Sequence, residues 1–157
     1  MAGEGKFIDG LMQGNVNVKG TVSGDGTDAS TIVALTASAT LTAAQSGKIF
    51  TLGTAGGFTV TLPAPAAGLN YQFFVKVAPT TAYIIASSAS ANKIYGAVAS
   101  AEDAAGSVGC AAASDTITFV ANKALIGDSV KLVSDGTNWY ATGFCNVQDA
   151  ITLTQAT

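Results

Sequence analysis

The residues that could carry catalysis are few, and their spacing fits no familiar catalytic arrangement. The 157 residues include no His, so a Ser-His-Asp triad cannot form and only a Ser–Lys pair could supply an activated nucleophile. Ser46, Gly47 and Lys48 look like the end of a phosphate-binding loop, but the upstream Gly is missing. Ile49 stands where such a loop needs Ser or Thr to hold magnesium. No pair of carboxylates is spaced for glycoside hydrolysis, and we predict no catalytic residue and no enzymatic activity.

Acidic and sulfur-containing side chains offer one weak metal candidate. Asp25 and Asp28, with Thr27, could ligate calcium, although turn chemistry explains the same residues. Cys110 and Cys145 are too few for a zinc site. A disulfide between them is possible, but two buried free thiols fit the sequence better. We predict neither a metal site nor a cofactor.

The remaining polar and aromatic candidates have structural explanations. Asp128 and Asp135 occupy positions where turns begin. Trp139 and Tyr140 could form a platform on which a sugar stacks, but they also suit packing across a hairpin. We expect Trp139, the only Trp, to be a core residue.

Composition excludes several classes of partner. Only 11% of the residues are charged, and the formal net charge is −3. The seven basic residues are isolated Lys without any Arg, so the chain lacks the clustered cations that nucleic-acid binding needs. No uncharged apolar run is long enough to cross a bilayer, and no secretory signal is visible. We expect a soluble protein, made in the cytoplasm, without a nucleic-acid or membrane partner.

Apolar residues alternate with Thr, Lys and Gln in many short runs, which is typical of strands with one buried face. The clearest runs are 58–62 and 115–144, where residues 134–138 have the composition of a tight turn. The alternation predicts these core residues: Phe58, Val60, Leu62, Phe73, Val75, Ile117, Phe119, Val130, Leu132 and Trp139.

The whole pattern indicates an all-β fold. Further strands are expected at 31–35, 48–52, 70–78, 82–86, 93–98 and 151–154, with a single helical turn at 42–45. Nine or ten short strands without a long amphipathic helix favour an antiparallel β-sandwich or barrel of jelly-roll type. A solenoid is disfavoured because no fixed repeat period is present.

Residues 1–30 differ in composition from the domain expected at 31–157. They are rich in Gly, Asn and Asp and contain too few apolar residues to form a core. We interpret them as an arm that becomes ordered against its own domain, a sister subunit or another protein; an unstructured terminus is the alternative. The apolar residues that would anchor this arm are Phe7, Ile8, Leu11, Met12, Val16 and Val18.

Residues 41–52, 57–79, 91–96, 115–120 and 127–143 together resemble the capsid decoration, or cement, proteins of tailed bacteriophages and related small virion proteins. The resemblance implies a homotrimer on the outer capsid surface. Its partner would be the major capsid protein, and its arm would clasp neighbouring subunits. The alternative is a tail-fibre or receptor-binding module that recognises a host-surface glycan. The candidate contacts for a glycan are Trp139, Tyr140, Tyr83 and Tyr95.

Overall fold

The computed structural model describes residues 31–88, 92–102, 107–109 and 113–155. The chain divides into two units, Met1–Ser30 and Thr31–Thr157, and the description concerns the second of them. The expected arm, with its proposed anchors, lies outside the described residues. Those anchors are Phe7, Ile8, Leu11, Met12, Val16 and Val18.

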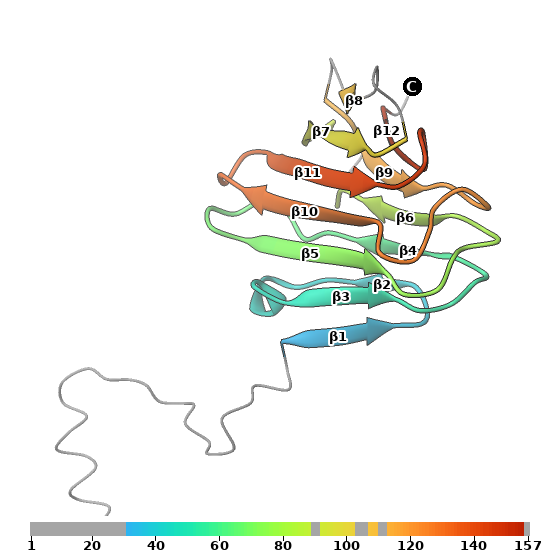
Figure 1. Cartoon of the computed structure of the whole chain (residues 1–157). Helices are drawn as coiled ribbons and strands as arrows, with labels where there is room; N and C mark the ends of the chain where they lie inside the picture. The colour runs from blue at the N-terminus through green and yellow to red at the C-terminus, as the bar shows by residue number, and fades with distance from the viewer. Residues whose placement is uncertain (1–30, 89–91, 103–106, 110–112, 156–157) are drawn as a thin grey trace, which may run out of the picture. The chain divides into compact units, whose positions relative to one another are not determined.

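The described domain is built from β-strands, as the sequence predicted, with 47% of the described residues in strands and 3% in helix. The strands form two mixed sheets (Figure 1). In spatial order, the seven-stranded sheet contains β1 (Ile32–Leu35), β3 (Ile49–Leu52), β5 (Asn70–Val75), β10 (Ser129–Ser134), β11 (Trp139–Cys145), β7 (Ile94–Ser100) and β8 (Ser107–Gly109). The five-stranded sheet contains β12 (Ile151–Thr154), β9 (Thr116–Phe119), β6 (Tyr83–Ala86), β4 (Phe58–Thr61) and β2 (Ala39–Thr40).

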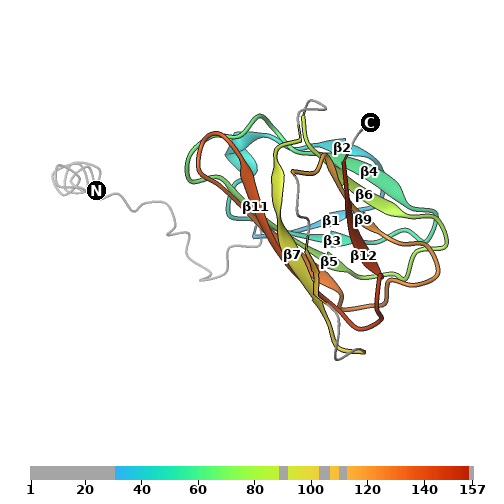
Figure 2. The same ribbon diagram turned by 90° about the horizontal axis from the view of Figure 1, so that it is seen from above.

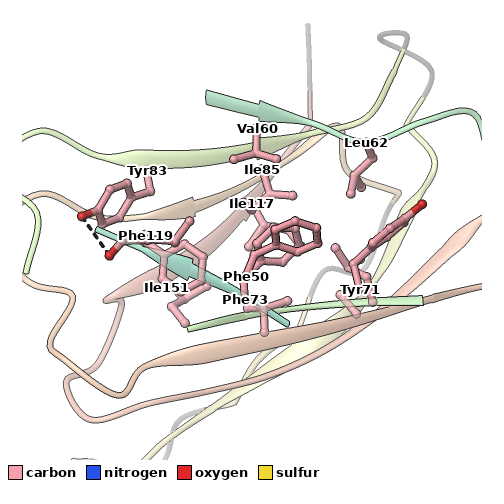
Figure 3. Close-up of a cluster of buried hydrophobic side chains, with 14 of the residues drawn as sticks. Phe50, Val60, Leu62, Tyr71, Phe73, Tyr83, Ile85, Ile117, Phe119 and Ile151 are labelled. Carbon is pink, nitrogen blue, oxygen red and sulfur yellow. Dashed lines mark hydrogen bonds between the residues drawn. The ribbon is translucent and has the colours of Figure 1, made fainter. Parts of the chain in front are cut away.

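The two sheets form two layers that enclose one hydrophobic core (Figures 2 and 3). Each sheet contributes the side chains that alternate inward along its strands. Phe50 and Phe73 stack in the seven-stranded sheet with ring centroids 5.5 Å apart. Tyr71 and Trp139 pack 5.6 Å apart in the same sheet. Of the ten core residues expected from the sequence, nine are buried and Phe58 is half-buried; the nine are Val60, Leu62, Phe73, Val75, Ile117, Phe119, Val130, Leu132 and Trp139.

The first six strands pair in parallel, so the expected antiparallel arrangement is wrong for this half of the chain. The chain alternates between the layers, with β1, β3 and β5 in one sheet and β2, β4 and β6 in the other. Each strand lies parallel to the strand two places earlier. Residues 32–86 therefore wind through three turns of a two-layered coil, an arrangement that differs from an antiparallel jelly roll.

Unequal connections hide this coil from the sequence. Ile32 pairs with Ile49, which follows it by 17 residues, but Ile49 pairs with Gln72, which follows by 23. Ala39 pairs with Val60 after 21 residues, and Val60 with Ile85 after 25. Because the turns of this coil differ in length, the sequence has no fixed repeat period. The absence of a period therefore argued against a solenoid, although the chain does wind in a solenoid-like way.

The second half of the chain closes both sheets mostly by antiparallel pairing. Strand β10 inserts between β5 and β11, and β9 pairs with β6 and β12. Strands β7 and β11 are parallel. The described residues contain twelve strands where nine or ten were expected, because the short β2 and β8 show no clear alternation of apolar and polar residues. The predicted helical turn is a 3₁₀ turn at Ala43–Gln45. The Oε1 atom of Gln45 accepts a hydrogen bond from the backbone N–H of Thr42 at 2.9 Å.

Candidate functional site

The chemically reactive side chains of the described residues are used to build the fold. Cys145 is a buried free thiol, and burial raises its pKa, which keeps it protonated and unreactive. The possible partner Cys110 lies outside the described residues. Within the described ranges, no three His, Cys, Asp or Glu side chains are grouped to hold a metal ion.

Asp128 joins two segments of the chain from a fully buried position. Its Oδ2 accepts the Leu125 N–H at 2.9 Å, which closes the turn before β10. Its Oδ1 accepts the backbone N–H of Asn146 at 2.9 Å and the side-chain Nδ2–H of the same residue at 2.7 Å. The carboxylate therefore fixes the end of β11 to the start of β10, a structural role in keeping with the turn that the sequence indicated.

Asp135 organises the turn between β10 and β11. Its Oδ1 accepts the N–H groups of Thr137 at 2.7 Å and Asn138 at 2.8 Å. Its Oδ2 accepts the hydroxyl of Tyr140 at 2.9 Å. The backbone N–H groups of Asn138 and Thr137, followed by the Tyr140 hydroxyl, lower the pKa of this carboxyl. Asp135 is therefore an ionised carboxylate on the surface, immediately beside an exposed aromatic ring.

The four aromatic residues proposed to contact a glycan separate into two pairs. Trp139 and Tyr83 are fully buried, and the Tyr83 hydroxyl donates to the Val77 carbonyl at 2.8 Å. Tyr95 and Tyr140 are exposed by 40% and 48%. Their ring centroids lie 6.3 Å apart because the two residues are register partners on β7 and β11. Only this second pair is available to an external partner.

Tyr95 and Tyr140 belong to a larger surface, which we call the docking face. It consists of the side chains that point outward from the seven-stranded sheet, opposite the core. The strand register arranges them in three rows. The first row is Asn70, Val133, Tyr140 and Tyr95; the second is Ile32, Ile49, Gln72, Lys131, Thr142 and Ala97; the third is Ala34, Thr51, Phe74, Ser129, Phe144 and Ala99.

The docking face is unusually apolar for a surface in contact with water. Ile32 is 61% exposed, Phe144 47% and Val133 40%, in addition to the two tyrosines. Lys131 is the only charged side chain in the three rows. Soluble monomers rarely leave a contiguous apolar patch of several hundred Å² exposed unless it binds something.

The other outer face of the same domain provides an internal comparison. Outward positions of the five-stranded sheet are almost all Thr, interrupted by Ile84 and Ala86 on β6. Threonine favours extended backbone and presents a hydroxyl to water. The threonines of this face are Thr40, Thr59, Thr61, Thr116, Thr118, Thr152 and Thr154. Of the two outer sheet faces, the docking face therefore carries more of the large exposed apolar side chains, and Leu125 and Ile126 are exposed outside both sheets.

The sequence contained only part of this information. Alternation along 129–134 and 139–145 places Val133, Tyr140 and Phe144 opposite the buried residues of their strands. It cannot show that Ile32, on a strand about a hundred residues earlier, contributes to the same face, because that depends on the order of strands in the sheet.

Comparison with known proteins finds no matching family model and no matching curated protein for this chain. Among the described residues, no helix has the length and apolar character required to cross a bilayer.

Proposed function

We propose that the chain is a non-enzymatic structural protein of a tailed-bacteriophage virion. In this proposal it binds the outer capsid surface as an oligomer, contacts the major capsid protein and strengthens the seams between capsomers. The observation that carries the proposal is the docking face, a broad apolar surface on a rigid two-layered domain. The resemblance of residues 41–52, 57–79, 91–96, 115–120 and 127–143 to decoration proteins supplies the identity of the partner.

The exposed aromatic area is large enough to matter for binding. Tyr95, Tyr140 and Phe144 are exposed by 40%, 48% and 47%, and an aromatic side chain can bury roughly 200 Å². These three residues together expose roughly 270 Å², and complete removal of that area from water would contribute at most about 7 kcal/mol before the costs of association. Linking several copies adds avidity, which can exceed the affinity of one contact by roughly a hundredfold or more.

The proposal predicts that one negative charge placed on the docking face weakens capsid binding. Val133→Asp introduces a carboxylate in the first row, where it would be desolvated against an apolar partner. Thr118→Asp is the matched control, because it adds the same side chain to an interior strand of the opposite outer face. Co-sedimentation of the full chain with capsids lacking it should lose at least tenfold in affinity for V133D and change little for T118D. Equal binding of V133D and wild type would refute the role of this face.

A second function is favoured by one observation. Tyr95 and Tyr140 form an exposed aromatic pair next to the Asp135 carboxylate, and such a pair can stack on a sugar while the carboxylate accepts hydroxyl groups. The chain would then be a tail-fibre or receptor-binding module that recognises a host-surface glycan. A glycan array probed with the full chain separates the two functions. Selective glycan binding that Y95A and Y140A remove would favour the receptor-binding module over the decoration protein.

A further inference from the structure

We infer that the docking face binds a second copy of this chain across a twofold axis at Val133, with Lys131 of each copy opposite Asp135 of the other. The inference rests on the self-association that the proposed function requires, and it names the surface and symmetry of that contact. It can be tested without any capsid, so its failure is distinct from failure of the proposed function.

Two opposite charges flank Val133 at equal distances along the chain. Lys131 is exposed on β10, two residues before Val133, and Asp135 follows it by two residues in the adjoining turn. Side chains two residues apart on a strand share a face. Asp135 is held at this face by the hydroxyl of Tyr140, which is the register partner of Val133. Along β10 and its turn, the cation of Lys131 therefore lies on one side of Val133 and the anion of Asp135 on the other.

Consider a twofold axis that lies in the plane of the docking face and crosses β10 at right angles at Val133. Rotation about this axis makes the charges of one copy complementary to the charges of the other. Such an axis stacks each strand on its own copy in the reverse direction, so a residue before Val133 meets a residue equally far after it. Lys131 then faces Asp135 of the second copy, twice per dimer. Thr142 similarly faces Asn138, while Val133 and Tyr140 meet their own copies at the centre.

This contact uses a known mode of sheet packing. Two sheets can stack face to face with their strands nearly aligned when both inner faces are apolar. A contact that contains its own complementary charges is isologous, meaning that both partners use the same patch. A heterologous contact, as in a threefold ring, joins two different patches and can pair Lys131 with Asp135 only once per interface, whereas the twofold contact pairs them twice. The arrangement of charge therefore favours a dimer over the trimer that the family resemblance implies.

The apolar composition of the first row fits the centre of such a contact. Standard protein interfaces bury about 800 Å² on each partner, with an apolar centre and a polar rim. Tyr95, Val133 and Tyr140 form the apolar centre, and they are between 40% and 48% exposed in the single chain. Lys131 and Asp135 lie to either side of this centre, where charge pairing sets the alignment of the two copies.

The decisive experiment is sedimentation velocity of the full-length protein over a range of micromolar concentrations. Wild type and the control T118D should sediment as dimers, and V133D as a monomer with an unchanged far-ultraviolet circular dichroism spectrum. A wild-type trimer overturns the inference. A wild-type monomer also overturns the inference. If V133D of such a monomer loses capsid binding, the docking face contacts the shell protein and not a second copy. A dimer that V133D leaves intact also overturns the inference.

A charge cycle tests the alignment separately. Lys131→Glu places two carboxylates opposite each other at both ends of the contact, and we expect the dimer dissociation constant to rise at least tenfold. Adding Asp135→Asn to that variant removes the repulsion but keeps a side-chain oxygen for the N–H groups of Thr137 and Asn138. The double variant should therefore dimerise more tightly than K131E alone. Equal or weaker dimerisation of the double variant would overturn the proposed pairing. That result is expected if Asp135 only stabilises its own turn and does not face residue 131 of the second copy.

Discussion

Gly96 marks the closest approach between the backbones of β7 and β11. A Cβ atom at this position would lie 1.9 Å from the carbonyl oxygen of Ala141, its register partner, and the residue has a φ of +156°. The obstruction is backbone, which cannot rotate away as a flexible side chain could. Gly56, by contrast, has an ordinary φ, and its nearest neighbour beyond the adjacent residues is 4.0 Å away.

We therefore expect Gly96→Ala to lower the free energy of unfolding by roughly 2–4 kcal/mol, in the range of severe single substitutions. Gly56→Ala is the control and should change it by roughly 0.5 kcal/mol or less. Chemical denaturation of both variants measures the difference. Similar stabilities for the two would mean that β7 and β11 are not paired at this register.

Two buried tyrosines make the stability of the domain sensitive to alkaline pH. Burial raises the pKa of Tyr71 above its usual 10.0, and it also raises that of Tyr83, where the backbone N–H of Thr54 acts in the opposite direction. The Tyr71 hydroxyl donates to the Thr42 carbonyl at 2.9 Å, which only the neutral phenol can do. The folded state therefore favours the protonated form of both side chains.

It follows that their contribution to stability is complete below pH 10 and is lost as the pH rises through the higher values of the folded state. Denaturation midpoints measured from pH 8 to pH 12 should fall above pH 10. The double variant Y71F/Y83F, which cannot ionise at these sites, should show a shallower fall from a lower starting stability. A slope identical to that of wild type would show that these two groups do not titrate differently on folding.

At the scale of elements, local alternation predicted most strands but not how they pair. The runs at 58–62, 70–78 and 129–134 have one apolar face, and each contains an observed strand, β4, β5 or β10. Parallel winding of β1 to β6 depends on pairing between residues 17 to 25 positions apart, and no local pattern specifies that distance. The hairpin of β10 and β11 could be predicted because the two strands are consecutive in the sequence and the turn residues 134–138 lie between them.

The docking face was partly predictable for the same reason. Residues such as Val133 and Phe144 can be assigned outward positions from their own strands. Their grouping with Ile32, Tyr95 and Phe74 depends on the order β1-β3-β5-β10-β11-β7 across the sheet. Of the glycan candidates, Tyr83 is buried, and Trp139 is buried as its assignment to the core predicted; an aromatic side chain next to a turn suits both packing and binding.

The pairing order makes a prediction about the relative stability of strands. Strand β5 is hydrogen-bonded on both sides, by β3 and β10, and β10 by β5 and β11. Among the described residues β1 pairs only with β3. Amide hydrogen exchange should therefore be roughly a hundredfold or more slower in β5 and β10 than at the outer edge of β1. Equal protection of β1 would show that another strand covers this edge.

At the scale of the whole molecule, we propose residues 1–30 as the segment that attaches to the capsid, because the inferred dimer contact would cover the docking face. An arm can add a strand to a neighbouring sheet edge, where main-chain hydrogen bonds supply affinity. We expect deletion of residues 1–15, which removes Phe7, Ile8, Leu11 and Met12, to leave a folded oligomer that no longer binds capsids. A pull-down with purified capsids measures this, and retained binding would limit attachment to the domain itself.

The central claim is that many copies of this β domain bind to a protein shell. If the chain is a virion protein as proposed, the most direct test is its number of copies per particle, measured by quantitative mass spectrometry of purified virions. The account predicts hundreds of copies, in fixed proportion to the major capsid protein. A handful of copies, as expected for a tail component, or none at all, would contradict it.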